Sequence, residues 1–129
     1  MCLIVDKDSQ IRRADREVEC WKVLSKIEDG GLCSKYAREP YELGEEKVIC
    51  DELKIMSRIN CTGVEMVERF VGKGFHTYAN SFDAEMCCDK NEVIVRCIIP
   101  VGAHYIEGTV NGVERGYVSD RLIVGKEVV

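Results

Sequence analysis

The chain has 129 residues, 46% of them hydrophobic and 32% charged, a composition that predicts one ordered domain spanning residues 1–129. The formal net charge of -5 argues against a protein that binds nucleic acid by covering phosphates with a positive face. Apolar runs are too short for a signal peptide or a membrane helix, so we expect a cytoplasmic protein that does not bind membranes.

The first half of the chain predicts mainly strands. A short buried strand, a polar loop or helical turn, a half-buried strand and its hairpin partner are expected at residues 2–5, 6–16, 18–27 and 32–34. In the half-buried strand, Trp21 and Val23 alternate with Lys22, so the lysine is expected on the solvent side. Residues 36–47 predict an irregular surface segment, and the pattern of residues 48–59 fits a helical face only in part.

The second half predicts strands around one helix. The strands are expected at 64–71, 75–79, 93–99, 105–110, 113–118 and 121–129, and the helix at about 81–90. Asn80 or Ser81 can cap that helix, and Asn111-Gly112 is the preferred dipeptide of a tight hairpin. Together these elements predict an α+β fold: a single strand-rich domain with a mixed or antiparallel sheet and one to three helices.

Cysteine usage points to free thiols. The chain has eight cysteines, which without an export signal favour reduced side chains over a disulfide framework. The adjacent pair Cys87-Cys88 has no second ligand pair of the spacing that zinc sites use. We therefore expect no metal site, and a redox role for this pair stays open.

Polar residues gather around residues 72–81. Lys73 lies between two glycines, and His76 and Tyr78 should share one face of the following strand because side chains alternate. A histidine beside a tyrosine offers a stacking surface with hydrogen-bond donors, and the helix start at Ser81 offers free amides to an anion. The predicted ligand-binding residues are Lys22, Lys73, Phe75, His76, Tyr78 and Ser81. A turn built by the two glycines, with Lys73 solvated, is the structural alternative.

A catalytic set is not evident. The two histidines, His76 and His104, have no Ser or Cys nucleophile at a recognised motif spacing, and each fits a structural role. Glu114 lies just beyond the hairpin dipeptide with Arg115 and Tyr117, where a carboxylate could polarise a ribose hydroxyl. Glu114 and His76 are therefore the alternative catalytic residues, although charges at a hairpin end are usually only solvated.

Two resemblances add to these expectations. The segments Cys20-Trp21-Lys22-Val23-Leu24, Tyr41-Glu42-Leu43-Gly44, Gly74-Phe75-His76-Thr77-Tyr78, Ile98-Ile99-Pro100-Val101-Gly102 and Tyr117-Val118-Ser119-Asp120 resemble a group of short uncharacterised phage and gut-bacterial proteins. More weakly, residues 72–79 with Ser81, Ala84 and the next strand are similar to the middle of the ADP-ribosyltransferase and poly-ADP-ribose polymerase fold. That similarity implies an NAD-dependent transferase fold, but its first-strand histidine or arginine is replaced by Lys22, and only Glu114 roughly matches its glutamate.

These observations favour binding over chemistry. The leading hypothesis is a cytoplasmic protein that binds a nucleotide-type small molecule, such as an ADP-ribose derivative or a cyclic nucleotide, without a cofactor. A phage protein of this kind would act in the host cytoplasm as an anti-defence protein that sequesters a host signal. The alternatives are an ADP-ribosyltransferase that uses NAD, and a protein–protein inhibitor of a host enzyme. A homo-oligomer is compatible with each hypothesis.

Overall fold

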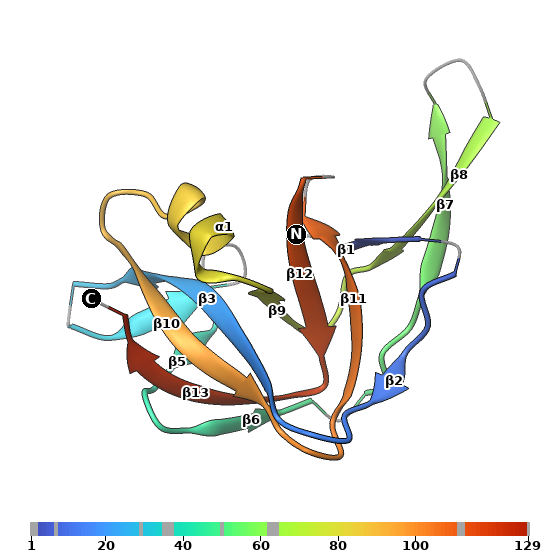
Figure 1. Ribbon diagram of the computed structural model, residues 1–129. Coiled ribbons are helices and arrows are strands. Elements are labelled where there is room, and N and C mark those ends of the chain that lie inside the picture. Colours follow the sequence, from blue (N-terminus) through green and yellow to red (C-terminus); the bar gives the residue numbers. More distant parts are fainter. Residues whose placement is uncertain are drawn as a thin grey trace.

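The protein is nearly all β, with 56% of the chain in strands and 6% in helix. The computed structural model describes residues 3–6, 8–28, 30–34, 38–49, 51–61, 65–110 and 113–128 (Figure 1). Every strand pairing in these residues is antiparallel. The predicted α+β class is therefore wrong, together with its mixed-sheet version and the ADP-ribosyltransferase-like fold proposed with it.

In the described residues, thirteen strands and one helix follow one another along the chain. The strands are β1 (Leu3–Val5), β2 (Arg12–Arg13), β3 (Val18–Lys26), β4 (Leu32–Ser34), β5 (Pro40–Tyr41), β6 (Glu46–Val48), β7 (Met56–Cys61), β8 (Glu65–Val71), β9 (Phe75–Tyr78), β10 (Glu92–Ile99), β11 (His104–Val110), β12 (Glu114–Ser119) and β13 (Arg121–Glu127). The helix α1 (Ser81–Met86) lies between β9 and β10. No helix in the described residues is long and apolar enough to cross a membrane.

All the strands belong to one sheet that curls on itself. Its main path is β6-β13-β10-β3-β9-β12-β11-β1-β8-β7, and β2, β4 and β5 are attached at its sides. In this order β12 lies four places from β13, yet only Asp120 separates the two strands in the chain. The sheet must therefore curl until they meet. Figure 1 also shows β7 and β8 extending away from the curl as a two-stranded arm.

The curl gives the sheet an inner and an outer face, each with its own hydrophobic cluster. The inner face carries Leu24, Val95 and Leu122 in one cluster, and the outer face carries Val23 and Val118 in the other. Because side chains alternate along a strand and both faces of the middle of β3 are buried, Lys22 has no solvent side there. Lys22 lies on the inner face at 9% exposure, so its predicted outward position is wrong.

The helix is shorter than predicted. It ends at Met86 rather than near Lys90, because the last amides turn back onto nearby carbonyl groups, with Cys87 N bonding to Ala84 O at 3.2 Å. Asn91, at a φ of 71°, then reverses the chain into β10. Asn80 is the cap, as expected, with its side chain accepting from Asp83 N at 2.8 Å. The helix packs on β3 and β9 and so covers the outer face (Figure 1).

Most predicted strands are present, while β2, β5, β6 and β7 were not predicted. The two halves of the last hairpin pair as β11 and β12, while its turn residues Asn111-Gly112 lie outside the described part of the chain. The segment 36–47, predicted as irregular, contributes β5 and most of β6. Residues 48–59, whose pattern fitted a helical face only in part, overlap strand β7 at their end. β2 and β5 have two residues each, too few to show alternation, and only their pairing with other strands makes them recognisable.

Candidate functional site

His76 and Tyr78 lie on the same face of β9, but that face is the packed outer one. Tyr78 is only 8% exposed within the outer cluster, and Phe75 points to the opposite face, where it is 3% exposed in the inner cluster. Gly74 adopts a φ of +138°, and a Cβ there would lie 2.4 Å from Val118 Cγ1. The glycine is thus required by a tight turn against β12 rather than by a ligand.

The ring of His76 is held by backbone carbonyl groups. Its Nδ1 lies 3.1 Å from Gly74 O, and its Nε2 lies 3.3 Å from Val71 O. Burial, with a smaller contribution from nearby Lys22, lowers the pKa of His76 from 6.5 to about 4. The imidazole is therefore neutral at neutral pH, and both of its nitrogen atoms face the protein's own backbone.

Lys73 and Ser81 lie apart from this ring. Lys73 is exposed and forms an ion pair with Asp51, whose pKa is lowered by that hydrogen bond. It lines a groove of about 690 Å³ beside Met56 and Phe70. Ser81 begins α1, but a helix of six residues has too small a dipole to form an anion site by itself. The structure does not bring these two residues together with His76.

Glu114 shares the outer face with His76 without forming a site with it. Val118 lies opposite His76, so Glu114 is four residues further along β12, about 13 Å away at the usual rise per residue. One carboxylate oxygen of Glu114 is buried without a hydrogen-bond partner in the described residues. The geometry therefore offers no acid–base pair between these two side chains.

A groove that the sequence did not reveal lies beside β11. Ile4 pairs with Thr109, so a straight continuation of β1 would place Asp8 opposite Tyr105. Arg12 lies opposite Tyr105 instead. The chain between β1 and β2 thus contains four residues more than the sheet can accommodate, and it loops away from β11.

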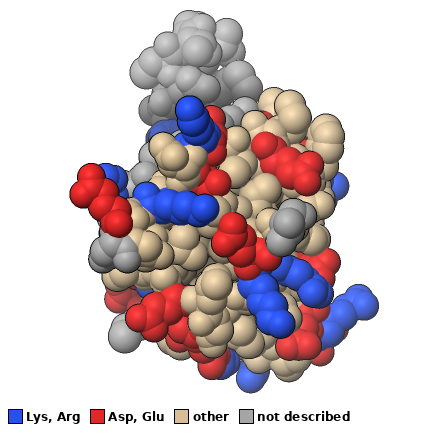
Figure 2. All heavy atoms as spheres, turned by 90° about the vertical axis from the view of Figure 1, so that its left-hand side faces the viewer, with Lys and Arg blue, Asp and Glu red and all other residues tan. Residues whose placement is uncertain are grey.

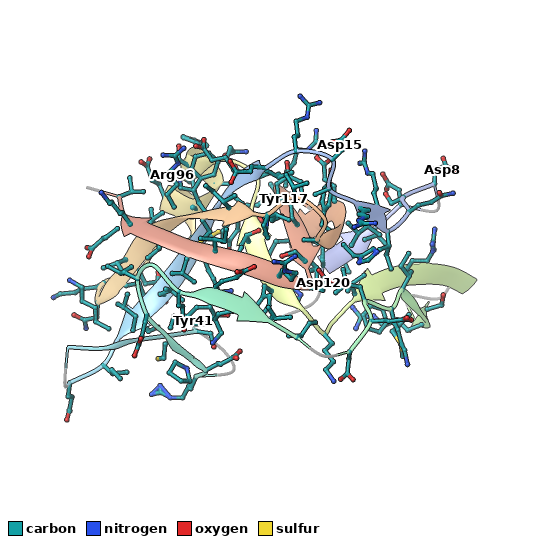
Figure 3. The ribbon with its side chains drawn as sticks, turned by 90° about the horizontal axis from the view of Figure 1, so that it is seen from below. Asp8, Asp15, Tyr41, Arg96, Tyr117 and Asp120 are labelled. Carbon is teal, nitrogen blue, oxygen red and sulfur yellow. The ribbon has the colours of Figure 1, made fainter. Side chains whose placement is uncertain are left out.

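This loop and the strands beside it enclose an open groove of about 730 Å³, here called the loop groove. Its charged lining residues are Asp6, Asp8, Arg12, Glu107 and Arg115, and its neutral polar ones are Ser9, Gln10 and Thr109. Figure 3 shows Asp8 on the outlying loop and Tyr117 nearer the centre of the molecule. The groove thus gathers residues from three parts of the chain.

Hydrogen bonds and ring contacts hold the groove's cations in place. The guanidinium of Arg12 lies 5.6 Å from the centre of the Tyr105 ring, and Tyr105 packs edge-on against Tyr117 at 5.9 Å. Arg115 forms an ion pair with Glu107, and this hydrogen bond raises the pKa of the guanidinium. Burial, and then Glu107, raise the pKa of the Tyr117 hydroxyl, which stays protonated.

The sequence contained part of this site. Arg115 and Tyr117 were noted beyond the hairpin dipeptide, while Arg12 lies in the segment 6–16, which was predicted only as a polar loop or helical turn. The surplus of residues between β1 and β2 was the missing signal, and it requires the register of two distant strands.

Other observations limit the classes of site. In the part of the chain that the structure describes, no group of His, Cys, Asp and Glu side chains could hold a metal ion. On the face drawn in Figure 2, basic and acidic side chains are interspersed, which does not fit a phosphate-covering surface. No family model, curated protein or solved structure matches this chain.

Proposed function

We propose that the protein binds a small nucleotide-type molecule, such as an ADP-ribose derivative or a cyclic nucleotide, in the loop groove. One observation carries the proposal: Arg12 and Arg115 line the same groove as carboxylates and neutral hydrogen-bonding side chains. Guanidinium groups bind phosphate oxygens in a two-pronged geometry that no other side chain offers. The groove volume of about 730 Å³ also lies within the range of small-molecule sites.

The other parts of a nucleotide have partners as well. Glu107 and Asp8 line the groove and can accept hydrogen bonds from ribose hydroxyl groups. A base can stack on the guanidinium of Arg12, whose other side already lies over the Tyr105 ring. Because the ion pair of Arg115 with Glu107 is at the surface, a phosphate can compete for the guanidinium at little cost.

Binding without turnover fits this arrangement best. The lining residues that the structure describes include no histidine, cysteine or lysine, and the carboxylate of Glu107 is already paired with Arg115. A protein that only binds a signalling nucleotide acts by sequestering it. We propose this role, in the host cytoplasm, for a phage-encoded protein of this kind.

Isothermal titration calorimetry with ADP-ribose, NAD and cyclic oligonucleotides tests the proposal. At least one of these ligands should bind the wild-type protein, and Arg12→Met and Arg115→Met should each raise Kd about tenfold or more. Lys73→Met is the matched control, since it removes an exposed cation outside the groove and should leave Kd unchanged.

Two results would contradict this site. Absence of binding to every ligand rejects the function, and a loss of affinity in Lys73→Met but not in the arginine variants moves the ligand to the other groove. Release of nicotinamide from NAD, abolished in Glu114→Gln, would support the transferase alternative instead.

A further inference from the structure

Three buried polar side chains in the described residues lie on one face of the sheet. In the described part of the chain, the buried side chains that are charged or polar are Lys22, Thr77 and Ser119, at 9%, 2% and 0% exposure. All three point to the inner face of the sheet, from the neighbouring strands β3, β9 and β12. Three independent strands thus direct polar groups into one apolar interior, at a cost that calls for compensation.

Strand register places the three side chains next to one another. Trp21 pairs with Tyr78 across β3 and β9, so the next position puts Lys22 opposite Thr77. Ser119 pairs with Phe75, which places its side chain diagonally across from Thr77 on the same face. Lys22 Nζ also reaches β9, where it donates a hydrogen bond to His76 O at 2.7 Å.

The charge of Lys22 is not neutralised by its surroundings. Among the described residues its ammonium forms no ion pair, and the nearby carboxylate of Glu39 is bound to Lys47 at 3.1 Å. Lys22 and Lys47 approach the ring of Tyr41 to 5.3 and 4.1 Å, so two cations share one aromatic ring. Burial lowers the pKa of Lys22 to about 8; Cys97, Cys20 and Glu39 oppose this shift in part, and Lys47 makes the smallest contribution to it. The ammonium is still the main form at neutral pH, and the cluster carries a positive excess.

The hydroxyl group of Ser119 has no hydrogen-bond partner in the described residues, and that of Thr77 has none there except the Cys20 thiol. The Thr77 hydroxyl lies beside the thiol of Cys20, which is a poor partner. An ammonium has three hydrogens to donate, and each hydroxyl can donate one. Only one of the three ammonium hydrogens has a hydrogen-bond acceptor among the described residues, and a bound species that carries negative charge could accept hydrogen bonds from the ammonium and from both hydroxyl groups.

We propose that Lys22, Thr77 and Ser119 bind a small monovalent anion of chloride size inside the curl of the sheet. A monovalent ion matches the single positive excess, and the apolar walls around it exclude larger, strongly hydrated dianions such as phosphate or sulfate. This site is separate from the loop groove and does not depend on the nucleotide proposal.

Chloride-35 NMR provides the direct test. Wild-type protein should broaden the chloride resonance beyond a protein-free solution, and nitrate or bromide should reverse the broadening by competition. Lys22→Met should abolish the excess width, and Thr77→Val and Ser119→Ala should each reduce it. Lys73→Met, which removes an exposed lysine, is the matched control and should keep the wild-type width.

Thermal unfolding provides a second readout, because an ion that binds only the folded state raises Tm. At constant ionic strength, exchanging gluconate for chloride should raise the Tm of the wild type by several degrees and leave that of Lys22→Met unchanged. The proposal would be overturned if Lys22→Met broadened the chloride resonance as much as the wild type. It would also be overturned if Lys73→Met lost as much of the broadening as Lys22→Met. If Lys22→Met does not fold, wild-type broadening in both Thr77→Val and Ser119→Ala would overturn the proposal.

Discussion

The two faces of the sheet treat polar residues in opposite ways. On the outer face, under α1, the conspicuous side chains His76 and Tyr78 are held by the backbone or packed among apolar residues. On the inner face, the buried Ser119 hydroxyl has no hydrogen-bond partner in the described residues and the buried Lys22 ammonium has no ion pair there, whereas the outer face leaves one such atom, a carboxylate oxygen of Glu114. Residues that look functional in a sequence can therefore be structural, since a face covered by a helix leaves them no access to a ligand.

Among the tests of this comparison, the largest loss of stability is expected for Tyr78→Ala. Removing a buried aromatic ring leaves a cavity on the outer face, and the free energy of unfolding should fall by about 3–5 kcal/mol. Urea denaturation measures the loss, and Tyr78→Phe, which keeps the ring, should lose much less. Nucleotide affinity of the folded fraction should not change. A folded Tyr78→Ala protein without nucleotide binding would place the ligand on the outer face.

The strands themselves were largely predictable. The alternation in 18–27 and 105–118 and the turn residues between strands are local features, and they give the correct elements. The position of Lys22 was not predictable, because an alternating strand indicates one polar face only when the sheet is open. The curl that buries both faces follows from the pairing of β3 with β10 and β9, which lie far away in the chain.

The loop groove follows the same rule. Arg12 lies far from Glu107 and Arg115 in the sequence. The three residues line one groove because β1 and β2 pair with β11 in different registers, which a sequence pattern does not reveal. The prediction of a ligand site at His76 rested on a local pattern of glycines and aromatic residues. That pattern is the same in a structural turn and in a binding loop, so it could not distinguish them.

The second test concerns the inner face and uses pH. Lys22 has a pKa of 10.5 when unfolded and about 8 when folded, so between these values the unfolded chain binds more protons. Its contribution to the free energy of unfolding should therefore rise with pH from 8 to 10.5, by up to about 3 kcal/mol. The measurement compares wild type with Lys22→Met in chloride-free buffer, so that titrations that do not involve Lys22 cancel; burial keeps the pKa values of the neighbouring Cys20 and Cys97 thiols above this range in the folded state. A stability difference that does not vary over this range would show that the Lys22 ammonium is compensated in the folded state.

The smallest effect is expected for Lys73→Ala, at a residue that belongs to neither face's buried set. Lys73 and its partner Asp51 have side chains that are 69% and 60% exposed, so water screens their attraction and both remain solvated when it is lost. The urea midpoint should stay within experimental error of the wild type at both low and high salt. A clear loss of stability at low salt that disappears at high salt would contradict this expectation. It would mean that charge at the turn before β9 holds the sheet together, and that surface pairs as well as the two clusters maintain the curl.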